Sequence, residues 1–148
     1  VAQPLDIYTM VERHRAYGDA LADAGLPQDP TLERLAESVE DAEAAVRELL
    51  ALPDPPTAIF SANNRVSVGA IRGLGEERHR VAMVGFDEVE LADALEVPLT
   101  VVRTDAAALG RGGAELLLRR MSGWTGEPQR ITMPTVLVAR GSGEIRPR

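Results

Sequence analysis

The feature that most limits the possible folds is an alternation of short apolar runs with longer amphipathic stretches. Apolar runs at residues 57–61, 80–86 and 99–103 have the length of buried strands. Between them lie stretches whose apolar residues recur every three or four positions, as on one face of a helix. Strands that alternate with helices of about ten or more residues predict βαβ units around a mainly parallel sheet, which is an α/β fold.

Two helices are expected in the first third of the chain. Residues 9–24 carry an apolar face that includes Met10, and the sequence that starts at Thr9 fits a capping box. Ser38 would cap the next helix, which must end before the prolines of residues 53–56. The stretch between these helices, around residues 31–36, has the weak alternation of a short strand.

Further along, Asn63 or Asn64 would cap a third helix that runs to about residue 77. A short helix is expected around residues 89–95, and Asp105 would cap a long last helix. The closing run of residues 131–138 contains a proline, which predicts an edge strand or a bend. The inner face of the long helix is expected to comprise Ala106, Leu109, Gly113, Leu116, Leu117 and Met121.

The charge balance and the missing residue types exclude several classes of function. Twenty-three acidic residues outnumber 16 basic ones, which are all Arg, and the net charge of −7 argues against DNA binding by this chain alone. With no cysteine, disulfides and thiolate catalysis are excluded. His14 and His79 lack the spacing of a metal site, and no nucleophile elbow or phosphate loop occurs. We therefore expect no enzyme, no metal, no cofactor and no membrane span.

Polar residues follow three of the predicted strands, at residues 61–64, 86–88 and 103–105. In open α/β sheets, ligands bind just beyond the carboxyl ends of the strands. The sequence therefore predicts a binding site built from these three segments.

Seven landmarks in a fixed order resemble the lac-repressor type of transcription regulator, and they span about residues 10–142. The most specific are Val-Gly-Phe-Asp-Glu at 84–88 and Pro-Leu-Thr-Val-Val-Arg at 98–103. The other five lie at residues 12–17, 56–64, 68–71, 109–117 and 134–142. The resemblance implies a periplasmic-binding-protein-like type I fold, with a three-layer lobe around a parallel sheet.

The resemblance also implies how the chain is organised. Family members join a DNA-binding helix-turn-helix to a two-lobed sensor. Residues 1–148 look like the C-terminal lobe of that sensor, and the chain looks like a fragment without the helix-turn-helix. The helix at about residues 106–122 would belong to the other lobe.

Four residues fall at ligand-contacting positions of the family: Arg13, Asn63, Asp87 and Thr104. A guanidinium fork, an amide and a carboxylate suit a polyhydroxylated effector, because each buried hydroxyl needs a partner. Simpler roles compete with this one. Arg13 could be a solvated charge, and Asn63 and Asp87 could only cap the helices that follow them.

Departures from the family pattern limit what can be said of the effector. Asn64 stands where the family has Asp, and Ala16 stands where it has Gly. Glu37 and Ala106 occupy positions that are often aromatic, and only 3% of the residues are aromatic. A small polar or charged effector is therefore as plausible as a plain hexose.

The resemblance predicts the effector-sensing portion of a cytoplasmic, homodimeric regulator. Its small-molecule effector would be sugar-like, and DNA would be contacted only through the helix-turn-helix. The alternative is an exported solute-binding protein of a sugar transporter with the same fold. A helix-turn-helix or a signal peptide upstream would distinguish the two.

Overall fold

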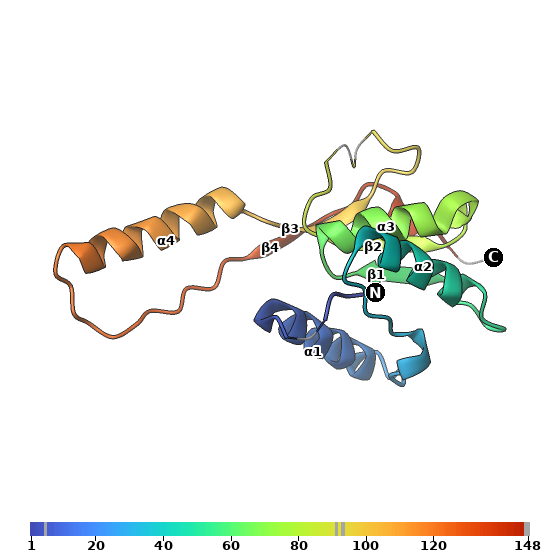
Figure 1. Cartoon of the computed structure of the whole chain (residues 1–148), viewed down its shortest axis with the longest axis horizontal. Coiled ribbons are helices and arrows are strands. Elements are labelled where there is room, and N and C mark those ends of the chain that lie inside the picture. The colour runs from blue at the N-terminus through green and yellow to red at the C-terminus, as the bar shows by residue number, and fades with distance from the viewer. Residues whose placement is uncertain (5, 91, 93, 147–148) are drawn as a thin grey trace.

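A computed structural model describes residues 1–4, 6–90, 92 and 94–146 (Figure 1). The helices are α1 (Tyr8–Asp23), α2 (Val39–Leu50), α3 (Asn64–Leu74) and α4 (Ala106–Met121), and the strands are β1 (Ala58–Ser61), β2 (Ala82–Phe86), β3 (Thr100–Thr104) and β4 (Thr135–Val138). Three short 3₁₀ helices are η1 (Pro30–Leu32), η2 (Gly75–His79) and η3 (Ser142–Glu144).

The strands form one sheet in the order β1-β2-β3-β4. The first three are parallel, and β4 pairs antiparallel with β3 at the edge. The predicted α/β fold with a mainly parallel sheet is confirmed. The edge position of β4 agrees with the proline just before it, since proline cannot donate to a strand partner on both sides.

Helices cover the sheet on both faces. On one face, α2 and α3 pack over a core that includes Val46, Leu49, Ile59, Met83 and Val101. On the other face lies α1, apart from the α2–α3 pair in Figure 1. Successive residues of a strand point to opposite faces of a sheet, so β1 can contact α2 and α3 on one face and α1 on the other.

The two helices of the core face approach closely because α3 is glycine-rich. A Cβ atom at Gly69 would clash with the carbonyl oxygen of Val39 and with the Cβ of Ala42, and one at Gly73 would clash with Val46. The predicted cap of α2 is confirmed as a full capping box between Ser38 and Asp41.

Replacing Gly69 by Ala should force α2 away from α3 and cost about 1–3 kcal/mol of unfolding free energy. Gly110→Ala on α4 is the control, because nothing lies within 4 Å of a Cβ atom there. In an exposed helix interior that change should add about 0.5–1 kcal/mol. Urea denaturation measures both, and a Gly69→Ala chain as stable as the parent would contradict the close packing.

Two of the expected local features near the N-terminus are wrong. Helix α1 begins at Tyr8 after Ile7, and no side chain caps it, so Thr9 does not start a capping box. Residues 31–36 are not a strand: η1 is followed by a single parallel bridge between Ala2 and Leu35. The remaining apolar positions of the expected α1 face are not buried like Met10, since the helix has one buried residue.

Two further expectations need correction. The α-helical part of α3 ends at Leu74 and continues only as η2, because Gly75 adopts a positive φ of 49°. In the region of the expected helix at residues 89–95, Leu91 and Asp93 lie outside the described residues, and the described neighbours form a turn and bends.

The arm made of α4 and the chain that returns to β4 extends away from the rest of the molecule (Figure 1). No residue of α4 is buried, so its expected inner face does not pack into a core within the described chain. Leu117 is 61% exposed and Met121 is 75% exposed. In the described part of the chain, no helix is long and apolar enough to cross a membrane.

Candidate functional site

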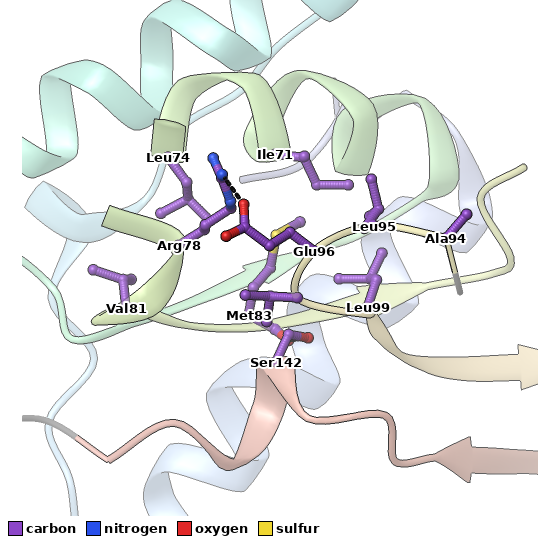
Figure 2. Close-up of a pocket in the computed structure, with 11 residues that line it drawn as sticks. Ile71, Leu74, Arg78, Val81, Met83, Ala94, Leu95, Glu96, Leu99 and Ser142 are labelled. Atoms are coloured by element: carbon purple, nitrogen blue, oxygen red, sulfur yellow. Dashed lines mark hydrogen bonds and ion pairs between the residues drawn. The ribbon is translucent and has the colours of Figure 1, made fainter. Parts of the chain in front are cut away.

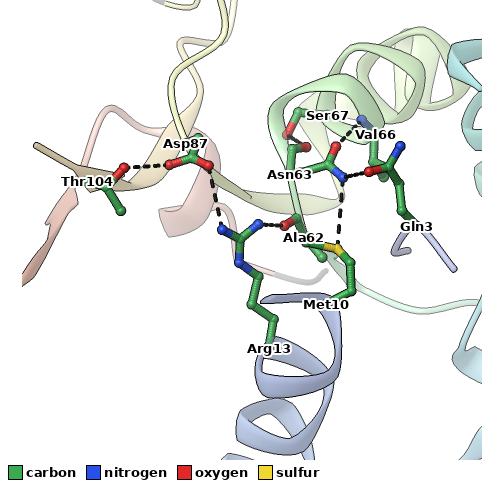
Figure 3. A network of polar contacts seen from close by, with 9 residues as sticks. All are labelled: Gln3, Met10, Arg13, Ala62, Asn63, Val66, Ser67, Asp87 and Thr104. Carbon is green, nitrogen blue, oxygen red and sulfur yellow. Dashed lines mark hydrogen bonds and ion pairs between the residues drawn. The ribbon is translucent and has the colours of Figure 1, made fainter. Parts of the chain in front are cut away.

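The predicted site residues come from four separate segments and gather at the carboxyl ends of the strands (Figure 3). Arg13 lies on α1, Asn63 lies between β1 and α3, Asp87 follows β2, and Thr104 ends β3. Parallel strands bring their carboxyl ends to one edge of the sheet, so the polar residues that follow them lie close together, as expected.

Asp87 is fixed by its backbone and by its side chain. Its amide N–H donates to the carbonyl oxygen of Val102 at 2.9 Å, which continues the β2–β3 pairing by one residue. The hydroxyl of Thr104 donates to Oδ1 of Asp87 at 2.8 Å. Asp87 has a φ of 68°, in the left-handed region, where Asp and Asn are found more often than other non-glycine residues.

Arg13 lies between Asp87 and the end of β1. One nitrogen of its guanidinium donates to the carbonyl oxygen of Ala62, and another is 3.7 Å from Oδ2 of Asp87. The guanidinium carbon lies 3.6 Å from the centre of the Phe86 ring, a cation–π contact. The side chain is 19% exposed, so the solvated-charge interpretation of Arg13 is wrong.

Burial lowers the pKa of Arg13, and the Asp87 carboxylate opposes that shift. Arginine stays charged despite such a shift, since its ordinary pKa is so high. The half-exposed pair therefore presents fixed donors and a carboxylate acceptor side by side at the strand ends.

Both the oxygen and the nitrogen of the Asn63 side-chain amide have hydrogen-bond partners. Its Oδ1 accepts from the backbone N–H of Val66 at 2.8 Å, so Asn63 and not Asn64 caps α3. Its Nδ2 donates to Oε1 of Gln3 at 2.9 Å and also faces the sulfur of Met10. Asn63 is adjacent in sequence to the carbonyl that Arg13 contacts, whereas Arg13 and Thr104 each contact Asp87 directly.

Removing the cap with Asn63→Ala should cost about 1–2 kcal/mol of unfolding free energy, because the amide of Val66 would lose its partner in a buried place. Asn63→Asp keeps an acceptor for that amide and should lose much less. The exposed neighbour supplies a control, Asn64→Ala, with an expected change within about 0.5 kcal/mol. Equal losses at both asparagines in urea denaturation would contradict the assignment of the cap.

Sequence reasoning placed Phe86 in one of the strand-end segments but not its contact with Arg13, and it missed Gln3. The contact of Phe86 with Arg13 joins segments that are distant in the sequence, so no local pattern indicated it. No pattern in the sequence indicates that Gln3 reaches Asn63. Glu88 lies next to the site and pairs with Arg140 at 2.7 Å, and the hydrogen bond from Arg140 lowers the pKa of that carboxyl.

A separate pocket of about 300 Å³ lies on the core face, between the end of α3 and residues 94–97 (Figure 2). Its lining is mainly apolar and includes Leu74, Met83 and Leu99. Arg78 and Glu96 pair with each other at its rim, and Ser142 donates to the carbonyl oxygen of Met83. Arg78, Glu96 and Ser142 therefore each have a partner within the protein, and the rest of the lining is mainly apolar.

No group of three or more His, Asp or Glu side chains within the described ranges is arranged to hold a metal ion. The chemistry available at the strand ends is therefore hydrogen bonding and charge, supplied by a guanidinium, a carboxylate, a hydroxyl and an amide.

Comparison with known families matches residues 4–143 to the periplasmic binding protein-like domain. Among curated proteins, the HTH-type transcriptional regulator CelR of Thermobifida fusca is 36% identical over 97% of this chain. The HTH-type transcriptional repressor CytR of Escherichia coli is 30% identical over 99% of it. These matches cover 44% and 45% of the two relatives, so the chain spans less than half of their length.

The similar solved structures are also transcription regulators. A CelR–cellobiose complex superposes with a TM-score of 0.87 at 36% identity, covering 97% of this chain and 45% of that one. A LacI-family regulatory protein from Chloroflexus aggregans superposes with a TM-score of 0.84 at 30% identity, covering 95% and 53%. The relatives are transcription regulators and not enzymes, as the sequence led us to expect.

Proposed function

This chain belongs to the periplasmic binding protein-like domain family, and we propose that it is an effector-sensing lobe of a lac-repressor-type transcription regulator. Its relatives are regulators and repressors of that type, which favours this function over an exported solute-binding protein. The net charge of −7 supports a division in which DNA is contacted outside these residues.

The cluster in which Arg13 and Thr104 both contact Asp87 at the strand ends carries the proposal that a ligand binds here. A carboxylate accepts two hydroxyl protons, while a guanidinium donates to the oxygens of the same hydroxyls. Phe86 and the Ala62 carbonyl already hold Arg13 in place, so little side-chain entropy remains to be lost on binding.

The effector would be sugar-like. The chemistry of the site suits vicinal hydroxyls, and the similar CelR structure is a complex with cellobiose. The candidate contacts are Arg13, Asp87 and Thr104 directly, and Asn63 would contribute by exchanging the weak bond that its amide nitrogen donates to the sulfur of Met10. Few rings are available for stacking, and Phe86 is covered on one face by Arg13.

Asp87→Asn should weaken binding of such an effector about 10–100-fold, because a charge-assisted hydrogen bond contributes about 1.5–3 kcal/mol. Asparagine tolerates the positive φ and still accepts from Thr104, so the fold should persist. Calorimetric titration with cellobiose and with ribose, on the longest native chain that contains these residues, measures the effect.

Asp105→Asn is the matched control, since it makes the same chemical change one residue beyond Thr104. Asp105 is an exposed cap of α4, and asparagine caps a helix about equally well. Affinity should therefore stay within about twofold. Equal losses in both variants, or none in Asp87→Asn, would contradict ligand binding at the strand ends.

We further propose that α4 packs against a second lobe that is not part of these 148 residues. The apolar side chains along it, among them Leu109, Leu117 and Met121, are exposed here, and exposed apolar patches of this kind mark interaction surfaces. The effector would then lie between the lobes and contact only half of its site on this chain.

The variant Leu117→Glu tests the role of α4. In the 148-residue chain it should change the unfolding free energy by no more than about 0.5 kcal/mol, because the position is exposed. In the longer native chain it should cost about 2 kcal/mol or more, since a charge would be buried against the second lobe. The same small change in both chains would show that α4 has no such partner.

The whole regulator would be a cytoplasmic homodimer that binds DNA through a helix-turn-helix. An effector would alter DNA binding only by as much as it prefers one arrangement of the lobes over the other. The similarity to CelR, a transcriptional regulator of the helix-turn-helix type, supports this arrangement.

A further inference from the structure

Glu88 follows Asp87 directly and is held by a two-point ion pair. Its Oε1 accepts from Nη2 of Arg140 at 2.7 Å, and its Oε2 accepts from Nη1 of Arg140 at 2.9 Å. Paired contacts of this kind fix the orientation of both side chains as well as balancing their charge. Arg103 adds a second cation, 3.8 Å from Oε1 of Glu88. The carboxylate of Glu88 is therefore held in one place, although its side chain is 39% exposed.

Arg140 can act as an anchor because the sheet fixes its own position. It comes two residues after β4, where the chain lies beside the start of β3. Its backbone N–H donates to Oγ1 of Thr100 at 3.0 Å, and its Nη1 donates to the carbonyl oxygen of Leu99 at 3.3 Å. Thr100 and Leu99 are both buried. Glu88 is thus tied through Arg140 to a buried part of the sheet.

Asp87 and Glu88 lie on opposite sides of the sheet. Along β3, Arg103 and Thr104 point to opposite faces, as successive residues of a strand do. Asp87 accepts from Thr104, whereas Glu88 lies beside Arg103. Glu88 is therefore directed away from the cluster that the effector is proposed to bind, and any part that it plays in binding must act through its neighbour.

The backbone at Asp87 depends on support from both sides. A φ of 68° is unfavourable for a residue with a side chain and persists only where the surroundings impose it. On the N-terminal side, the amide of Asp87 donates to the carbonyl oxygen of Val102 at 2.9 Å. On the C-terminal side, the ion pair of Glu88 fixes the next residue. With both sides tied, the Asp87 carboxylate stays directed at Arg13 and Thr104 (Figure 3).

We propose that Glu88 is a positioning residue for the effector site: held by Arg140, it keeps the Asp87 carboxylate facing Arg13 and Thr104. The proposal rests on the proposed function, since it takes the strand-end cluster as the place where the effector binds. Without the ion pair, the backbone after Asp87 can leave the left-handed region, and the carboxylate turns away from its two partners. The effector then meets an acceptor that must first be ordered, which weakens binding.

The ion pair is present at neutral pH. The hydrogen bond from Arg140 and the charges of Arg140 and Arg103 lower the pKa of Glu88, against the opposing effect of burial. A carboxyl with a lowered pKa begins to lose its stabilising contribution only as the pH falls below its ordinary value of 4.5. The pair therefore supports Asp87 throughout the neutral range and is no pH switch there.

Glu88→Ala and Glu96→Ala test the proposal as a matched pair in the longest native chain that contains these residues. Both glutamates lie on the connection between β2 and β3. Each replacement removes a carboxylate that pairs with an arginine, which is Arg140 for Glu88 and Arg78 for Glu96. Only Glu88 is adjacent to Asp87, so only its replacement should disturb the strand-end cluster.

Hydrogen exchange at the amide of Asp87 reports the effect of the ion pair without any ligand. In Glu88→Ala this amide should exchange about tenfold faster or more relative to the amide of Gly85, which lies within β2. Glu96→Ala should leave that ratio within about twofold. A merely structural loss would speed both amides alike, because both would exchange through unfolding of the whole domain. Equal acceleration of the two amides in Glu88→Ala, or none, would overturn the proposal.

Glu88→Gln supplies a milder variant that keeps the length of the side chain. It should raise the same exchange ratio by less than Glu88→Ala does, because a neutral amide accepts a weaker hydrogen bond from Arg140 than a carboxylate does. A larger rise in Glu88→Gln than in Glu88→Ala would contradict support of Asp87 through this pair.

Titration with cellobiose and with ribose measures the effect on binding. Affinity should fall about fivefold or more in Glu88→Ala and stay within about twofold in Glu96→Ala. Asp87→Asn combined with Glu88→Ala should weaken binding by less than the product of the separate effects, because both act on one carboxylate. Unchanged affinity in Glu88→Ala, or a combined loss equal to that product, would overturn the proposal. If the parent chain binds neither sugar, the proposed sugar-like effector is wrong, while the exchange ratio still decides whether Glu88 positions Asp87.

Discussion

The parallel pairing of β1, β2 and β3 is the constraint on which the rest of the molecule depends. It places the ends of three strands at one edge of the sheet, so Arg13 reaches both Ala62 and Asp87, and Asp87 also accepts from Thr104. The pairing extends one residue past β2, through the bond from Asp87 to Val102. That bond holds Asp87 in a left-handed conformation and aims its carboxylate at Arg13 and Thr104.

The strand–helix alternation, the caps at Ser38, Asn63 and Asp105, and the cluster at the strand ends could all be predicted from sequence. These features depend on local spacing or on the general geometry of parallel sheets. The start of α1 could not, because Thr9 fits a capping box while the turn begins at Ile7 without one. The contact of Phe86 with Arg13 also escaped prediction, since it joins segments that only the tertiary fold brings together.

The burial of α1 and α4 was predicted from apolar periodicity, and the two helices depart from it for related reasons. The periodicity of apolar residues shows which face of a helix is apolar, but it does not show which part of the sequence packs against that face. No residue of α4 is buried in the described chain, and α1 covers a cavity instead of a filled layer. The exposed apolar face of α4 lies where the proposed second lobe would add contacts.

These features also bear on how an effector could act through α1. The helix has one buried residue, Met10, and its polar link to the strand ends runs through Arg13. A ligand that bonds to Asp87 and Arg13 would compete with or reinforce this link, and so would change how firmly α1 is held on the sheet.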